Sequence, residues 1–359
     1  EARYPGIRAG RLYEIRERAE DATAHAAAPP PEPSLFEDLP LPPPARHAEA
    51  PHPDHEIQPL LPHSLSRMGP GVAWLDIEGD GDDDLVVGTG RGGWPAAYLN
   101  QGPGGLQAVP APPGAPALDD LTGMAAWPDA GGAARLWLGR KGYEAPGAAA
   151  VLGWARPGTG SAPVSADLPG LTNVSALALT FPGGPPLLFV GGGVAPGAYP
   201  EAAPSRLFRW AADRWVPDPR GAVLDRLGIV QAAVWSDLDG DGAAELVLAC
   251  EWGPVRVFRV GLAALVEETR SLGLDRWTGW WRSVQAADVD GDGRMDLVAG
   301  NWGLNTGYAA SADRPLRLYH GDLVGSGGVD LVEAWSPADR PFEVPRRGLR
   351  PLSMAFPVL

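Results

Sequence analysis

The sequence predicts an all-β protein, a β-propeller built from four-stranded blades. An acidic loop of nearly constant pattern occurs three times, as DIEGDGDDDL from Asp76, DLDGDGAAEL from Asp237 and DVDGDGRMDL from Asp288. Each loop leads directly into a short apolar run, and similar runs recur along the chain at a near-constant interval. Runs that are short, rich in β-branched residues and bounded by glycine are typical of buried strands.

The interval between the apolar runs is close to 50 residues. The steps are 51, 51, 59 and 51 residues along the series Leu85, Leu136, Leu187, Leu246 and Leu297, so one insertion explains the odd value. This period suits a four-stranded blade and is too long for leucine-rich repeats. A sixth unit begins at Asp322 after a shorter interval, so it or the unit before it is abbreviated. We expect five to six blades here and seven in the complete protein.

The acidic loops predict about three calcium sites. Carboxylates at positions 1, 3, 5 and 9 with glycine at position 6 follow the order in which a calcium loop presents its oxygens. Position 12 is apolar, so we expect each loop to join two strands rather than two helices. The alternative is a solvated turn. The predicted ligands are Asp76, Glu78, Asp80, Asp82 and Asp84, then Asp237, Asp239, Asp241, Ala243 and Glu245, then Asp288, Asp290, Asp292, Arg294 and Asp296.

Within these sets, Asp82, Ala243 and Arg294 stand at position 7, where a calcium loop uses its backbone carbonyl. The loop at Asp322 keeps Asp330 at position 9 but lacks carboxylates at positions 3 and 5. We expect weak or absent calcium binding there. Mg²⁺ fits these loops less well, because it retains its waters and demands a rigid octahedron. The expected role of the ion is structural, to relieve repulsion between the carboxylates.

Composition excludes several classes of protein. The net charge of −15 argues against a nucleic-acid partner, which needs a basic surface. The chain has no apolar stretch of the length that a membrane span requires, so we expect no membrane insertion. Residues 20–57 are rich in Pro and Ala and predict an extended linker, in which His52, Asp54 and His55 could form a metal site or a solvated stretch. The oligomeric state stays open.

A ring of aromatic residues is the candidate ligand site. Trp94, Tyr143, Tyr199, Trp252 and Trp302 each follow one of the recurring apolar runs. By hairpin alternation, these connections emerge opposite the calcium loops, where aromatic side chains could grip a glycan or a peptide. The alternative is packing between blades, which also favours large aromatic side chains.

The three loops resemble the FG-GAP or VCBS repeat family, whose members include integrin α-chain heads. Gly300–Tyr308, Gln58–Trp74 and Ala9–Ile15 further resemble proteins that pair such repeats with an ASPIC/UnbV domain, the group that includes cartilage acidic protein. The resemblance implies that 1–19 are the tail of a preceding domain and that 58–359 form the propeller, incomplete at its C-terminus. It also implies an extracellular, periplasmic or cell-surface module for adhesion or recognition, without catalysis.

A polysaccharide-active lyase or hydrolase on the same fold is the alternative function. The chain contains no nucleophile elbow, helical zinc motif or phosphate-binding loop. An acid–base pair would have to come from carboxylates outside the metal loops, such as Asp119, Asp120 and Glu251. No second feature of the sequence supports these three residues as catalytic, so we expect a binding module that recognises a glycan or a protein.

Overall fold

The computed structural model describes residues 47–356, apart from 112, 115, 129–133, 149, 156, 158–160, 167, 182, 304–305, 309 and 338. All of them belong to the compact unit Pro42–Leu359. The predicted domain tail 1–19, and the predicted linker as far as residue 46, lie outside the described residues. Among the described residues, no helix is long and apolar enough to cross a membrane.

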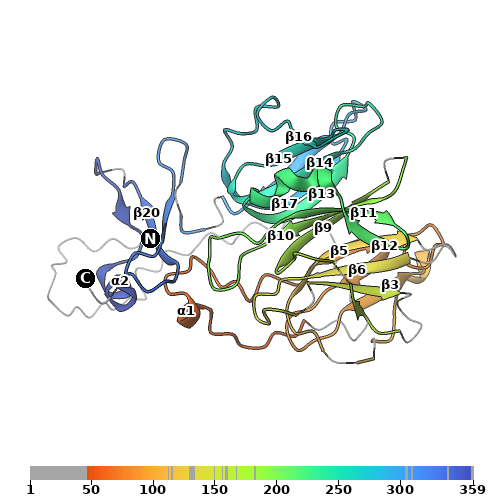
Figure 1. Cartoon of the computed structure of the whole chain (residues 1–359), viewed down its shortest axis with the longest axis horizontal. Coiled ribbons are helices and arrows are strands. Elements are labelled where there is room, and N and C mark those ends of the chain that lie inside the picture. Colours follow the sequence, from red (N-terminus) through yellow and green to blue (C-terminus); the bar gives the residue numbers. More distant parts are fainter. Residues whose placement is uncertain are drawn as a thin grey trace, which may run out of the picture. The chain divides into compact units, whose positions relative to one another are not determined.

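The described residues form successive antiparallel sheets, which confirms the all-β prediction (Figure 1). Each of the first three sheets has four strands that pair in chain order. Their strands are β1 (Val72–Leu75), β2 (Asp84–Val87), β3 (Ala96–Asn100) and β4 (Leu106–Ala108), then β5 (Leu121–Pro128), β6 (Ala134–Arg140), β7 (Val151–Ala155) and β8 (Val164–Ser165), then β9 (Val174–Thr180), β10 (Leu187–Gly192), β11 (Arg206–Ala211) and β12 (Arg214–Pro217).

The fourth blade also has four strands, but its β14 pairs with β17 of the fifth blade, so the two blades share one six-stranded sheet. The remaining strands are β13 (Ile229–Ser236), β14 (Glu245–Gly253), β15 (Arg256–Val260) and β16 (Leu265–Glu267), then β17 (Gly279–Ala287) and β18 (Asp296–Asn301), then β19 (Arg317–Gly321), β20 (Asp330–Trp335) and β21 (Val344–Pro345). The helices are α1 (Asp54–Ile57), η2 (Gly102–Gly104), η3 (Pro219–Arg226) and α2 (Leu349–Ala355). Among the described residues, the fifth blade contributes the two strands β17 and β18 before the chain enters the sixth unit, which has three strands, so both are abbreviated.

The five recurring leucines occupy equivalent places, as the repeat interval predicts. All of them lie in the second strand of a blade, in β2, β6, β10, β14 and β18. Three of them face large aromatic residues on the third strand, where Leu85 pairs with Tyr98, Leu136 with Trp154 and Leu246 with Phe258. The acidic loops join the first and second strands, as expected for hairpin connections.

Consecutive sheets pack face to face, and this explains why the second strands are apolar without alternation. β9 lies between β5 and β13, and β17 follows β13 (Figure 1). Leu246 and Leu248 of β14 pack into the core shared with the third sheet. Val247 and Ala249, which point the other way, pack into the core shared with the fifth. A strand buried on both faces needs apolar side chains at every position.

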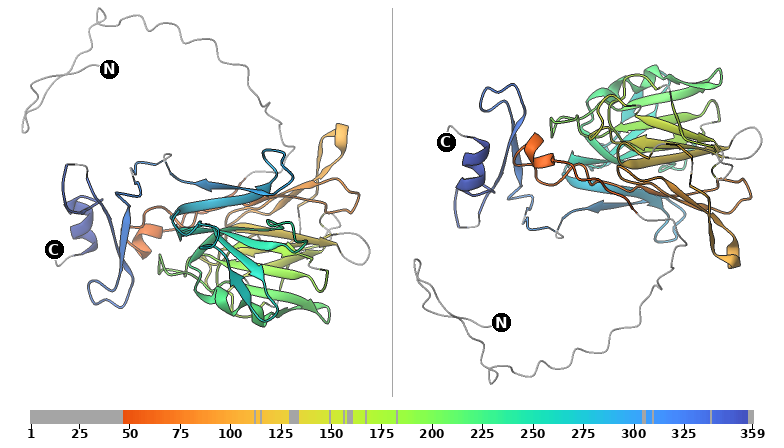
Figure 2. Two further views of the ribbon diagram at one scale, coloured as in Figure 1. Left: turned by 90° about the horizontal axis from the view of Figure 1, so that it is seen from above. Right: turned by 90° about the horizontal axis from the view of Figure 1, so that it is seen from below.

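The N-terminal described segment is packed, which corrects the predicted boundary of the linker. Residues 47–57 include α1, and Asp54 is buried where its carboxylate accepts hydrogen bonds from the backbone of Leu65 and Ser66, both 3.1 Å. Leu60 and Leu61 follow it into a core with α2 and β20 (Figure 2). His55 is exposed whereas Asp54 is buried, so these two side chains do not face a common site, and only His55 fits the alternative of a solvated stretch. The proline-rich composition predicted an extended linker, but the buried carboxylate of Asp54 organises a turn in this segment.

Close packing of the first two blades makes a prediction about Gly71. A Cβ atom at this position would lie 1.9 Å from the carbonyl oxygen of Thr122, whereas a Cβ at Gly184 would meet nothing within 4 Å. We expect Gly71→Ala to lower the free energy of unfolding by about 1–3 kcal/mol, the cost of overpacking. Gly184→Ala is the control and should change it by less than about 0.5 kcal/mol. Equal urea midpoints for the two variants would contradict this packing.

Candidate functional sites: acidic loops and a buried polar network

The acidic loops share one hydrogen-bonded frame. In the loop from Asp237, the position 1 carboxylate accepts from the backbone N–H groups of Gly240 at 2.8 Å and Gly242 at 2.9 Å. The position 9 carboxylate of Glu245 accepts from the N–H of Leu238 at 2.9 Å. The loops from Asp76 and Asp288 repeat these contacts at the same positions. Carboxylates at positions 1 and 9 therefore shape the turn as well as offering ligands.

Two glycines permit this frame, and the sequence argument used only one of them. Gly240 has φ 78° and Gly242 has φ 88°, in the left-handed region that L side chains rarely adopt. The equivalent pairs in the other loops also have positive φ, and they are Gly79 and Gly81, Gly291 and Gly293, and Gly325 and Gly327. Glycine at position 4 was visible in all four loops and could have strengthened the alignment.

The donor set of the loop at Asp237 fits a calcium ion. One oxygen each from Asp237, Asp239 and Glu245 lie within 4.8 Å of one another. Glu245 is 2% exposed, and its Oε1 has no hydrogen-bond partner among the described residues. Burial raises the pKa of Glu245, and the charges of Asp239 and Asp241 raise it further. A hard cation bound by oxygen would satisfy this oxygen and remove the repulsion.

The other two predicted loops differ in how far they gather their carboxylates. Asp288, Asp290 and Asp296 bring three oxygens within 4.8 Å, as in the Asp237 loop. Among the described residues, the first loop brings no such trio together, although burial and the charges of Asp80 and Asp84 raise the pKa of Glu78. The structure thus brings together three of the five predicted ligands in each of two loops. No contact tests the carbonyl groups at position 7.

The Asp322 loop keeps the frame without the carboxylate cluster. Asp322 accepts from Ser326 and Gly327, and Asp330 accepts from Leu323 and Val324. The same turn thus forms with only two carboxylates. It is a natural control for separating the structural part of the motif from its capacity to bind a metal.

The predicted aromatic ring is largely packed into the protein, which corrects its assignment as a ligand site. Tyr199 is 0% exposed and Tyr143 is 5% exposed, so neither can contact a ligand. Trp252 and Trp302 are half-buried and pack edge-on against Trp280, both with ring centroids 5.0 Å apart. Trp94, Tyr143 and Tyr199 lie between the second and third strands of their blades, whereas Trp252 lies within β14. Hairpin alternation carries no information on burial. Trp94, at 41% exposed, is the member that stays accessible.

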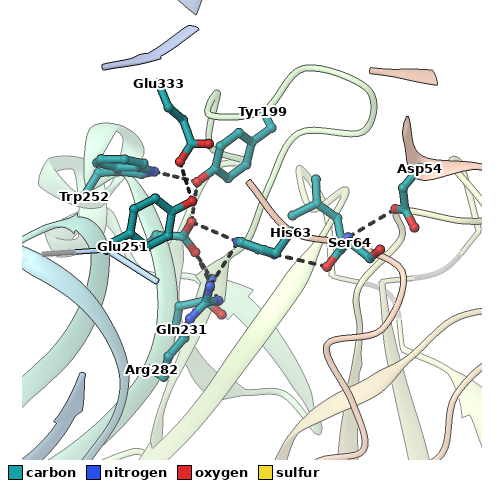
Figure 3. A network of polar contacts seen from close by, with 11 residues as sticks. Asp54, His63, Ser64, Tyr199, Gln231, Glu251, Trp252, Arg282 and Glu333 are labelled. Atoms are coloured by element: carbon teal, nitrogen blue, oxygen red, sulfur yellow. Dashed lines mark hydrogen bonds and ion pairs between the residues drawn. The ribbon is translucent and has the colours of Figure 1, made fainter. Parts of the chain in front are cut away.

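A buried network centred on Glu251 lies where β14 ends (Figure 3). One oxygen of Glu251 accepts from the Tyr199 hydroxyl at 2.5 Å, and the other accepts from Gln231 at 2.8 Å. Arg282 Nη1 forms an ion pair with Glu251 at 3.1 Å. The guanidinium of Arg282 also lies over the ring of Trp302, 4.4 Å from its centroid. Glu251 is therefore surrounded by donors from three separate segments.

His63 also contacts this network. Its Nδ1 lies 3.1 Å from the carbonyl oxygen of Ser64, which can only accept, so Nδ1 carries a proton. Its Nε2 lies 3.0 Å from Arg282 Nη2 and 3.5 Å from Glu251 Oε1. Burial alone would raise the pKa of Glu251, but His63, Arg282 and Tyr199 together lower it to about 2. Glu251 therefore stays ionised at neutral pH, opposite the positive charge of Arg282.

Two features of this region, its buried carboxylates and its single lysine, are present in the sequence but could not be interpreted from it. Asp119, Asp120 and Glu251 are all buried, and partners distant in sequence surround them. Lys141, the single lysine of the chain, is also buried, and burial lowers its pKa to about 8 against the opposing charge of Asp120. A lone lysine directly after an apolar run was the signal that could have identified this region.

Removing the charge of Glu251 should destabilise the fold. We expect Glu251→Gln to lower the free energy of unfolding by about 3–5 kcal/mol, because it leaves Arg282 buried without its partner. Glu267→Gln, which breaks a partly exposed pair with Arg256, should cost less than about 1 kcal/mol. Urea titrations measure both. Equal losses in the two variants would show that the network does not hold these segments together.

The same network predicts acid sensitivity. The pKa of Glu251 in the folded protein lies below its ordinary value of 4.5, at about 2. Its contribution is therefore complete above pH 4.5 and is lost as the pH falls towards 2. The stability difference between the wild type and Glu251→Gln should shrink across this window, as measured by urea titration at each pH. A difference that is constant with pH would be evidence against this assignment.

Comparison with known proteins identifies one repeat. An FG-GAP-like repeat matches residues 237–299, which run from the first ligand of the second acidic loop to the end of the apolar run after the third. No curated protein matches the chain. FG-GAP repeats are typical of extracellular or surface proteins, and they suggest at most an adhesion-type module.

Proposed function

We propose that this protein is a calcium-stabilised recognition module of the adhesion type, acting outside the cell or at the cell envelope on a glycan or protein ligand. The observation that carries the proposal is the unpartnered Oε1 of Glu245, which lies in a carboxylate trio within the matched repeat. A buried carboxylate oxygen without a donor among the described residues is costly unless a cation binds it.

Bound calcium would stabilise the hairpins formed by the first and second strands of these blades. Asp237 and Glu245 already organise the loop through backbone N–H groups, so a bound ion would add charge neutralisation to an existing frame. Affinity in the range of about 10⁻⁴ to 10⁻³ M, usual for extracellular modules, suffices for this role in a calcium-rich compartment. Binding to the folded state alone raises stability by mass action.

Recognition is favoured over catalysis by the state of the buried carboxylates. Glu251, the best-enclosed candidate for acid–base chemistry, has its oxygens engaged by Tyr199, Gln231 and Arg282. With a pKa of about 2, it is also a poor proton donor near neutral pH. We therefore propose that the protein binds its ligand without turnover.

Calcium dependence can be tested with two matched loop variants. At a calcium concentration about 100 times the dissociation constant, each site should add about 2.7 kcal/mol to the free energy of unfolding. The calcium-induced gain is the free energy of unfolding in calcium minus that in chelator. Asp288→Asn should reduce this gain by about the contribution of one site. Asp322→Asn damages the same frame in the loop without the carboxylate trio, and it should leave the calcium-induced gain unchanged.

Equilibrium unfolding with calcium and with chelator measures both variants. Unfolding of the wild type that is indifferent to calcium would contradict the proposal. An equal reduction of the calcium gain in Asp288→Asn and Asp322→Asn would also contradict it, because the effect would then belong to the shared frame rather than to the ion.

Ligand binding can be tested at Trp94, the accessible member of the aromatic set. Trp94→Ala should weaken binding on a glycan and matrix-protein array by about 2 kcal/mol or more, if this side chain anchors the ligand. Phe181→Ala removes a similarly exposed aromatic from the connection between β9 and β10, on the end of the sheet that carries the acidic loops, and is the control. Release of products from the arrayed glycans would instead support an enzyme.

A further inference from the structure

We propose that Glu49, Asp120 and Glu144 form a second kind of metal site, specific for a divalent cation of the Mn²⁺ type and separate from the acidic loops. One carboxylate oxygen from each of these residues lies within 4.8 Å of the other two. Oxygens on opposite sides of a cation at bond lengths of 2.3–2.6 Å are at most about 5 Å apart, so the spacing matches a shared ion.

The oxygens of this cluster lack the donors that buried carboxylates require. Asp120 is 1% exposed, and its Oδ1 has no hydrogen-bond partner in the part of the chain that the structure describes. The Glu144 side chain is fully buried, and neither of its oxygens accepts a hydrogen bond from a described residue, although Oε1 lies 2.9 Å from Arg91 Nε. The orphaned oxygens belong to residues that face one another, which points to a ligand between them.

Surrounding groups hold the three carboxylates in place. Asp120 Oδ2 accepts from the backbone N–H groups of Met68 at 2.9 Å and Gly69 at 3.0 Å, which leaves Oδ1 to face the cluster. Asp119 accepts from the N–H groups of Glu144 and Ala145 and so positions the segment that carries Glu144. Supporting contacts of this kind are typical of metal centres, where they orient the ligands.

Glu49 reaches the cluster because a glycine makes room for it. A Cβ atom on Gly90 would lie 2.4 Å from Glu49 Oε2, so a larger residue there would displace the carboxylate. Glu49 Oε2 lies 3.2 Å from His47 Nε2, while Oε1 is buried and has no partner in the described residues. Each of the three carboxylates is thus anchored through other atoms and keeps an oxygen unengaged.

The donor atoms of this cluster, oxygen and nitrogen, determine which ion it favours. Three carboxylates favour hard cations, and His52 adds an imidazole whose Nδ1 lies 3.8 Å from Glu144 Oε1. His52 Nε2 is buried and has no partner within the described ranges. Oxygen ligands with one nitrogen in reach suit Mn²⁺ better than Ca²⁺, which the acidic loops favour with oxygen alone.

The test is a titration of the full chain with Mn²⁺ in the presence of about 10 mM calcium, enough to occupy loops of extracellular affinity. The electron paramagnetic resonance signal of free Mn²⁺ reports binding. We expect the wild type to bind one equivalent, and Glu144→Gln and Glu49→Gln to bind at least about tenfold more weakly. Asp339→Asn, which changes an exposed carboxylate elsewhere, is the control and should bind as the wild type does.

Thermal unfolding separates loss of the site from loss of the fold. Mn²⁺ should raise the melting temperature of the wild type above its value in calcium alone, and should not do so for Glu144→Gln. The calcium-induced rise should survive in that variant, which shows that it is folded. Failure of the wild type to bind Mn²⁺ in excess calcium would overturn the proposal, as would unchanged affinity in both glutamine variants.

Discussion

A carboxylate removed from water needs hydrogen-bond donors or a positive charge close by, because the free energy of burying an unpaired ion is large and unfavourable. Three buried carboxylates in this chain meet that requirement to different extents. Glu245 accepts from one backbone N–H, and its other oxygen has no hydrogen-bond partner among the described residues. Glu251 is matched by Arg282 and by uncharged donors. Glu144 has Arg91 nearby but too few donors, and its raised pKa records the deficit.

The two ends of one strand connect the loop chemistry to the buried network. β14 begins at Glu245, in the acidic loop, and carries Glu251 near its other end. Its central residues are fully buried between neighbouring sheets, so the strand is a rigid link. At its far end it also pairs with β17, which carries Arg282. The proposed ion at the loop would therefore constrain the strand that places Glu251 opposite Arg282.

Local sequence patterns predicted the fold well, but they did not predict the contacts between distant segments. The spacing of Leu85 and Leu246 located second strands, because a blade buries that strand on both faces and the pattern is contained within a few residues. Glu251 could not be interpreted from sequence, since its partners come from segments as distant as His63, which lies 188 residues away. The frame of the acidic loops was predictable for the opposite reason, because every donor lies within the loop itself.

The aromatic residues opposite the acidic loops act mainly by excluding water. Trp252 donates to the Tyr199 hydroxyl, and Trp302 covers the guanidinium of Arg282. Water would otherwise screen the attraction between Glu251 and Arg282, which strengthens as the local dielectric falls. Large side chains at these connections therefore enclose the polar network rather than present a surface. Trp94, whose connection lies outside this network, remains 41% exposed.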